Sequence, residues 1–247
     1  MVTPRRRPRR PRRPRRPSDQ RLGVVGQVSY GSNVPERYEF RRQFDQQLAD
    51  IDAKVIRLFA LVSEAVAAAT DSLLAGDRAA AEATAERDAF VDELEQDLEG
   101  LAQRELLRQS PMAGDMRYLL TVIRVVPELE RSGDLAEHIA QRAIAGLATR
   151  LSPSVRGILQ EMGTTCVEMW RAAADAWAER DAEAAERIDA IDDRVDDLHD
   201  QLIAELGVGE LELADALQTT LVGRFYERLG DHSVHISERI SYLALGT

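Results

Sequence analysis

One short acidic motif occurs twice in this chain, at 128–142 as ELERSGDLAEHIAQR and at 225–239 as FYERLGDHSVHISER. Seven residues agree between the copies, and in each copy a Glu precedes an Asp by four positions. The two pairs are Glu130 with Asp134 and Glu227 with Asp231. On a helix such residues lie on one face, about 5–6 Å apart at Cβ. The repeat therefore predicts a helical fold built twice, with a carboxylate pair in each half.

A glycine stands directly before the Asp in both copies, as Gly133 and Gly230. Glycine inside a helix costs roughly 0.5–1 kcal/mol relative to alanine. A close-packed neighbour or an approaching ligand would explain why this position twice carries no side chain. A solvated helix face is the alternative for a single motif of this kind, but the repetition with the same Gly, Arg and His favours a functional site.

A second pair of carboxylates precedes each motif. ERDAFVDELEQDL at 86–98 aligns with AIDDRVDDLHDQL at 190–202, and each segment carries two Asp residues four positions apart, beside an apolar seam. Each half therefore offers two helices with paired carboxylates. The eight candidate metal ligands are Asp88, Asp92, Glu130 and Asp134 in the first half and Asp192, Asp196, Glu227 and Asp231 in the second.

Four carboxylates gathered without a cation would repel one another, and some would be forced to bind protons. A metal ion removes that conflict, and oxygen ligands suit Mg, Ca, Mn or Fe better than Zn or Cu(I). We expect divalent or trivalent metal ions, with iron, manganese, magnesium and zinc as the candidates. His138 and His235 follow the two motifs, and the sequence leaves open whether they contact metal, support the ligands or have no part in the site.

Apolar residues recur along the chain at alternating four- and three-residue spacings, which is typical of long bundle helices. The predicted fold is all-α: two tandem three-helix bundles related by internal duplication, at 39–150 and 151–247. A disordered Arg/Pro-rich tail at 1–38 precedes them. The second helix is expected to run unbroken from near Asp77 to Ser110, and the Met and Trp residues of the fourth helix are interpreted as core.

The charge is unevenly distributed. Residues 1–17 hold nine arginines and no acid, whereas the remainder holds 23 basic and 43 acidic residues. An acidic body suits cations or basic partner surfaces, so we expect no specific nucleic-acid binding. The tail itself is either a non-functional extension or a basic arm for nucleic acid or anionic membrane. The single Cys166 and the lack of about 18 consecutive apolar residues predict a soluble, cytoplasmic protein.

The segments ERSGD at 130–134 and ERLGD at 227–231 resemble the E(D)xxxD motif of the PhoU family in its ERxGD form. PMAGDMR at 111–117 resembles the P-x-A-x-D-L-R turn of that family. The resemblance extends from about Phe40 to Leu245. The second half departs from it, with Glu212 and Ala214 where the first has Asp115 and Arg117.

The resemblance implies a non-enzymatic regulator that represses phosphate-starvation signalling when phosphate is plentiful. Its implied partners are the ATPase subunit of the phosphate ABC transporter and a sensor histidine kinase, through which it would associate peripherally with the membrane. The resemblance also implies a homodimer, and multinuclear metal clusters at the carboxylates, with iron among the metals.

Two other function classes stay open. One is a purely structural helical interaction module whose carboxylates are solvated, which metal analysis of the pure protein would distinguish. The other is a carboxylate-bridged di-metal oxidase, whose sites use Glu-x-x-His pairs. No Glu precedes any of the four histidines by three positions, and His199 with Asp196 comes nearest. The oxidase is therefore the weaker alternative.

Overall fold

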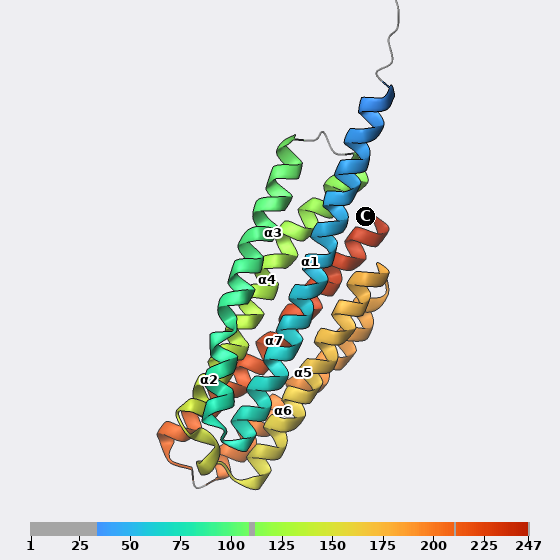
Figure 1. Ribbon diagram of the computed structural model, residues 1–247. Helices are drawn as coiled ribbons and strands as arrows, with labels where there is room; N and C mark the ends of the chain where they lie inside the picture. Colours follow the sequence, from blue (N-terminus) through green and yellow to red (C-terminus); the bar gives the residue numbers. More distant parts are fainter. Residues whose placement is uncertain (1–33, 109–111, 210, 247) are drawn as a thin grey trace, which may run out of the picture.

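The described residues, 34–108, 112–209 and 211–246, form seven α-helices and one short 3-10 helix in the computed structural model (Figure 1). None of these residues lies in a strand. The elements are α1 (Val34–Ala75), α2 (Arg78–Glu86), α3 (Asp88–Arg108), α4 (Ala113–Ile144), η1 (Leu147–Arg150), α5 (Pro153–Glu179), α6 (Ala184–Val208) and α7 (Leu213–Leu245).

The helices form two bundles that lie side by side. The first contains α1, α2, α3 and α4, and the second contains α5, α6 and α7. Helix α1 packs against α5 and α4 packs against α7, so these four long helices form the centre of the molecule (Figure 1). Helix α3 covers one side of this centre and α6 the other. The predicted all-α fold with duplicated bundles is confirmed.

A continuous apolar core joins the two bundles. Trp170 and Trp177 of α5 are fully buried, as predicted, and both rings pack against Phe59 of α1 at centroid distances of 6.4 and 6.1 Å. Beside them, Asp52 of α1 accepts hydrogen bonds from the Trp177 indole at 3.0 Å and from the Tyr118 hydroxyl at 3.2 Å. The contact between the halves is therefore packed like a protein interior, where Asp52 pairs the polar atoms of Trp177 and Tyr118, but the indole nitrogen of Trp170 is buried without a hydrogen-bond partner among the described residues.

The expectation of one unbroken second helix is wrong. The chain forms α2 and then α3, with Arg87 between them. The amide of Arg87 bonds to the carbonyl of Thr84 at 3.2 Å, and the amide of Phe90 bonds to the carbonyl of Arg87 at 3.0 Å. These three-residue hydrogen bonds tighten one turn and interrupt the α-helical ladder. Neither Gly nor Pro marks this position, so the break is invisible in the sequence.

Several helix ends follow their sequence signals. Gly76, which follows α1, has a positive φ of 67°, and the Ser152 hydroxyl accepts a hydrogen bond from the amide of Val155 at 3.2 Å. Helix α4 continues through Pro127 and ends at Ile144, and the short 3-10 helix η1 follows it. Both motifs therefore lie well inside long helices.

The prediction for the tail falls largely on residues 1–33, which lie outside the described residues, and α1 already begins at Val34. One described segment, Glu39–Ala75 of α1, is long and apolar enough to cross a membrane by length and composition alone, which the sequence reading did not expect. Half of its most apolar window is buried, and Ile51, Val55 and Val62 are fully buried in the shared core. Packing between the two bundles thus accounts for the apolar composition of α1.

Candidate metal centre

Three carboxylates of the first bundle converge between α3 and α4. Asp88 and Asp92 come from the first turns of α3, and Asp134 comes from the middle of α4. One oxygen from each lies within 4.8 Å of the other two. Glu130 lies one turn before Asp134 on the same helix. Ligand oxygens around a hard cation lie at roughly 2.0–2.6 Å from it, so small side-chain adjustments would bring these oxygens onto one ion.

Gly133 lets the two helices approach at this cluster. A Cβ at this position would lie 3.1 Å from Oδ1 of Asp88 and 3.2 Å from Cγ1 of Val91. Gly230 has the equivalent place in the second bundle, where a Cβ would lie only 2.1 Å from Oδ1 of Asp192. The missing side chain therefore makes room, in both halves, for the first Asp of the neighbouring helix.

Burial and mutual repulsion disfavour ionisation in the first cluster. Burial, with the nearby charges of Asp134 and Asp92, raises the pKa of Asp88 to about 7. The pKa values of Glu130 and Asp134 are also raised, first by burial and then by neighbouring acids, including Asp134 for Glu130 and Asp92 for both. A metal ion placed among these groups would favour their charged forms, so the cluster has the electrostatics of a cation site.

The carboxylates of the second bundle also lie near enough to raise one another's pKa values. Burial, with the charges of Asp196 and Asp231, raises the pKa of Asp192 to about 7, and burial with Glu227 and Asp231 raises that of Asp196. Oδ1 of Asp192 is buried without a hydrogen-bond partner. Among the described residues, however, no three carboxylates of this set come within 4.8 Å of one another. Asp196 is exposed.

Two side chains that the sequence analysis did not place at the metal site lie against Glu227 in the second cluster. Arg224 forms an ion pair with Glu227 on α7, and Nδ1 of His199 on α6 lies 3.2 Å from Oε2 of Glu227. In the first cluster the position of His199 holds Glu95, whose charge raises the pKa of Glu130 further. The alignment at 190–202 pairs these two residues, so a comparison of the repeats could have found them.

The sequence did not decide the roles of His138 and His235, and the two residues have different surroundings. The His138 ring stacks on Phe225 of α7, with centroids 5.4 Å apart, and its charge favours ionisation of Asp134. His235 is exposed. A third histidine, His232, follows Asp231 directly and is hydrogen-bonded through Nδ1 to the Ser132 hydroxyl at 3.0 Å. This buried contact joins the two motifs where α4 crosses α7.

The chain matches a family model twice. The PhoU domain model covers residues 55–143 and 159–240, which are the two bundles. This chain belongs to the PhoU family. Its relatives include the phosphate-specific transport system accessory protein PhoU homolog 2 of Mycobacterium tuberculosis, 32% identical over 209 residues, which cover 83% of this chain and 98% of the relative. PhoU homolog 1 of Mycobacterium leprae is 32% identical over 223 residues, covering 84% and 95%.

Solved structures show the same family fold. The crystal structure of PhoU from Pseudomonas aeruginosa superposes with a TM-score of 0.77 at 29% identity, over 83% of this chain and all of that one. The phosphate transport system regulatory protein PhoU of Streptococcus pneumoniae gives a TM-score of 0.74 at 24% identity, over 83% and 98%, which supports the fold alone. The family resemblance seen in the two ERxGD motifs is thus confirmed over most of the chain.

Proposed function

We propose that this PhoU protein is a metal-binding regulator of phosphate uptake, which silences phosphate-starvation signalling when phosphate is plentiful. The observation that carries the proposal is the match of both bundles to the family model, together with full-length relatives named as accessory proteins of phosphate-specific transport. We propose no enzymatic activity for it. In this function the helical surface contacts the ATPase subunit of the phosphate ABC transporter and a sensor histidine kinase.

The proposed metal sites are the two carboxylate sets, one in each bundle. The ligands are Asp88, Asp92, Glu130 and Asp134, and Asp192, Asp196, Glu227 and Asp231. Their all-oxygen chemistry favours iron, manganese or magnesium over zinc. The three converging oxygens of the first set and the buried, unpartnered oxygen of Asp192 in the second set support this assignment. We further propose that the protein is cytoplasmic, a homodimer, and bound to the membrane only through its partners.

A reporter driven by a phosphate-starvation promoter tests this function in cells grown with abundant phosphate. Glu130→Ala with Asp134→Ala should leave the reporter active, whereas the wild-type chain should silence it. Glu93→Ala, an exposed acid of α3 outside the cluster, is the matched control and should silence the reporter normally. Circular dichroism of each purified variant separates loss of signalling from loss of folding.

Normal silencing by a variant that lacks both carboxylate sets, with metal loss confirmed by elemental analysis, would contradict the metal part of the proposal. The bundles would then act as a purely structural interaction module. Failure of the wild-type chain to silence the reporter would contradict the regulatory part. If the double variant unfolds, the metal contributes stability instead, because a ligand bound only by the folded state stabilises that state by mass action.

A further inference from the structure

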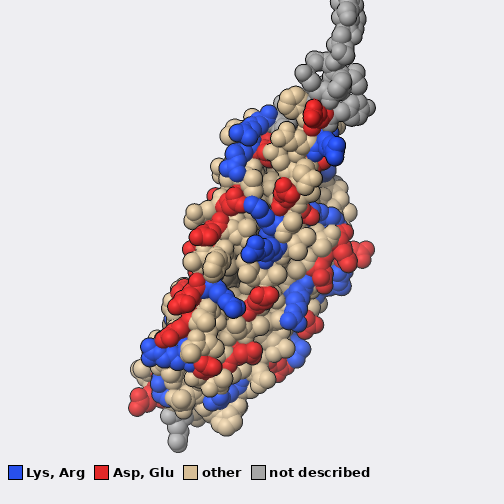
Figure 2. Space-filling view, in the orientation of Figure 1, with Lys and Arg blue, Asp and Glu red and all other residues tan. Residues whose placement is uncertain are grey.

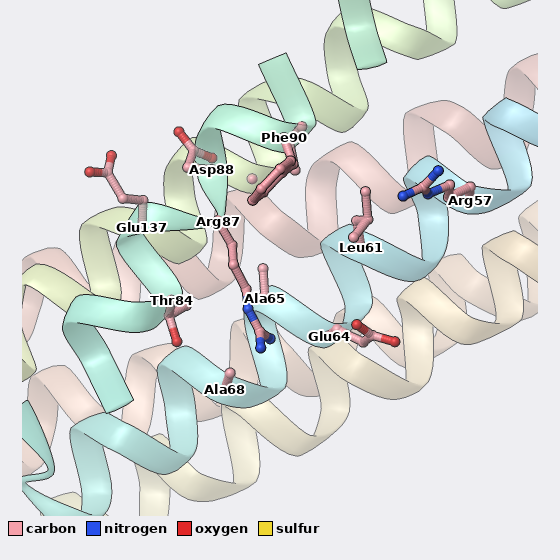
Figure 3. A pocket seen from close by; sticks show the side chains of 12 residues that line it. Arg57, Leu61, Glu64, Ala65, Ala68, Thr84, Arg87, Asp88, Phe90 and Glu137 are labelled. Carbon is pink, nitrogen blue, oxygen red and sulfur yellow. The ribbon is translucent and has the colours of Figure 1, made fainter. Parts of the chain in front are cut away.

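A pocket of about 340 Å³ opens on the first bundle between α1, the α2–α3 junction and α4 (Figure 3). Its apolar wall contains Leu61 and Ala65 of α1 and Phe90 and Val91 of α3. Small-molecule sites of proteins have volumes of roughly 300–1,000 Å³ and mostly apolar walls with a few polar groups. The pocket therefore has the size and lining of a site for a small ligand, and it does not overlap the contact between the bundles.

Over its described residues, the second bundle has no equivalent of this open wall, because the longer side chain of Met169 lies where the first bundle has Ala65. Helices α1 to α3 are in register with α5 and α6 at an offset of 104 residues, so that the buried Val55 and Val62 correspond to the buried Leu159 and Cys166. In this register Ala65 corresponds to Met169. The methyl carbon of Met169 lies 3.6 Å from where a Cβ on Gly230 would be. In the first bundle the short Ala65 leaves that volume empty.

Two further pairs of positions follow the same pattern. Thr84 and Arg87 of the first bundle correspond to Ile188 and Ile191 of the second, so polar groups line the pocket where the other repeat has apolar ones. Ile188 is fully buried. At these positions the first repeat has small or polar side chains where the second has apolar ones, and they lie at the pocket.

The mouth of the pocket also differs between the repeats. In the second bundle Arg194 bonds to Glu161 at 2.5 Å and ties α6 to α5. The equivalent residues of the first bundle are Phe90 and Arg57, which cannot form that pair. The ring of Phe90 is 62% exposed at the rim. An exposed aromatic ring beside an open apolar wall offers a stacking surface to a ligand.

The polar groups of the pocket are arranged on different sides. Figure 3 shows Asp88 and Glu137 on one side and Arg57 with the acid Glu64 on the other, with Phe90 and Leu61 between them. Within the described part of the chain, neither Arg57 nor Arg87 has an ion-pair partner. A guanidinium has five N–H donors in a fork that matches carboxylate and phosphate oxygens. Unpaired arginines beside an apolar wall are suited to an anion that also carries an apolar group.

We propose that this pocket binds a small organic anion. Its apolar body lies against Leu61, Ala65 and Phe90, and its carboxylate or phosphate group pairs with Arg87, while Arg57 adds positive charge at the opposite rim. Asp88 belongs to the carboxylate cluster and Glu137 lies on the same side, away from Arg57, whereas Glu64 lies on the side of Arg57 and limits the net positive charge there. The inference depends neither on the proposed metal sites nor on the proposed role in phosphate regulation.

Isothermal titration calorimetry on the metal-free, full-length protein tests the proposal. The probes are phenyl phosphate and phenylacetate, which share a ring but differ in the anionic group, with benzylamine as the cationic counterpart and inorganic phosphate as the group without a ring. We expect saturable binding of at least one ring-bearing anion, at least tenfold tighter than that of benzylamine or inorganic phosphate. Binding of only one of the two identifies the acid group that the site prefers.

Two variants test whether the anion binds in this pocket. Ala65→Met introduces the side chain that the second repeat uses to fill the space, and Arg87→Ile introduces its apolar residue at the junction. Each should weaken binding of the ring-bearing anion at least tenfold. Arg78→Ile, which removes an exposed arginine of α2 outside the pocket, should leave binding unchanged.

Three results would overturn the proposal. They are no saturable binding of either ring-bearing anion, binding of benzylamine as tight as that of the anions, and unchanged binding in Arg87→Ile. Because Arg87 is exposed and lies at a turn, Arg87→Ile should fold, and it tests the proposal even if Ala65→Met does not fold.

Discussion

The two bundles of this PhoU protein carry the same plan of four carboxylates each, with different local charges. In the first, oxygens of Asp88, Asp92 and Asp134 lie within 4.8 Å of one another and Glu95 adds a further acid. In the second, Glu227 is ion-paired with Arg224 and lies 3.2 Å from His199. The two halves thus share one scaffold, while the charged side chains around the carboxylates differ between them.

The physical reason is the balance between repulsion and compensation. An unpaired cluster of acids must bind protons or a metal ion, whereas an acid that already has a cationic partner needs neither. The first cluster should therefore bind metal more tightly than the second. The two repeats also differ at the pocket, where Ala65 leaves space that Met169 occupies in the second bundle.

Removal of ligands should have the largest effect and the clearest contrast. Asp88→Asn with Asp134→Asn should weaken Mn²⁺ binding at the tighter site by about 100-fold or more, since even supporting residues of metal sites contribute about 10–100-fold. Asp192→Asn with Asp231→Asn should affect only the weaker class of sites. Calorimetric titration with Mn²⁺ measures both. Equal affinities in the wild-type protein would refute the ranking of the clusters.

Substitution of the two glycines should weaken metal binding more in the second bundle than in the first. Gly230→Ala places a Cβ 2.1 Å from Oδ1 of Asp192, so the carboxylate must turn away, and second-site affinity should fall about tenfold. Gly133→Ala meets Asp88 at 3.1 Å and should cost the first site only about threefold. The same Mn²⁺ titration measures these changes. Because alanine favours helix, circular dichroism should show both variants folded. A larger loss at Gly133 would contradict the packing argument.

A single charge change should make the second cluster resemble the first. His199→Glu introduces the residue that the first bundle has at this position, and the added charge should tighten metal binding there about fivefold, or about 1 kcal/mol. Gln201→Glu adds the same charge at an exposed position of α6 and is the control. Titrations in low and high salt should show a smaller gain in high salt. No difference between the two variants would show that His199 does not limit the site.

The smallest effect concerns the pH dependence of the metal-free protein. The pKa values of Asp88 and Asp192 are raised to about 7 from about 3.8, so the folded state binds protons more tightly than the unfolded state. Stability should therefore fall as pH rises from about 4 to 7. Asp88→Asn should add about 1 kcal/mol or less at pH 7, after allowance for solvent screening, and nothing at pH 4. Chemical denaturation at both pH values measures this. Stabilisation at pH 4 would contradict the assignment.

Much of the fold could be predicted because helix signals are local. Apolar spacing placed many of the buried residues of α1, α3, α4, α5 and α6, and Gly76 and Ser152 lie at helix ends as their chemistry predicts. The break at Arg87 could not be predicted, since its residues have no helix-breaking chemistry and three-residue hydrogen bonds alone define it. The duplicated Gly133 and Gly230 did predict a close approach, and the approaching groups are Asp88 and Asp192.

The sequence by itself determined the helical class, the duplication and the eight candidate ligands, because periodicity and internal repetition can be read along one chain. The tertiary structure alone decided that the bundles share a core, that three carboxylates converge in only one of the two sets within the described residues, and that a pocket opens beside them. These properties depend on distances between side chains of different helices. Packing sets those distances, and no local pattern encodes them.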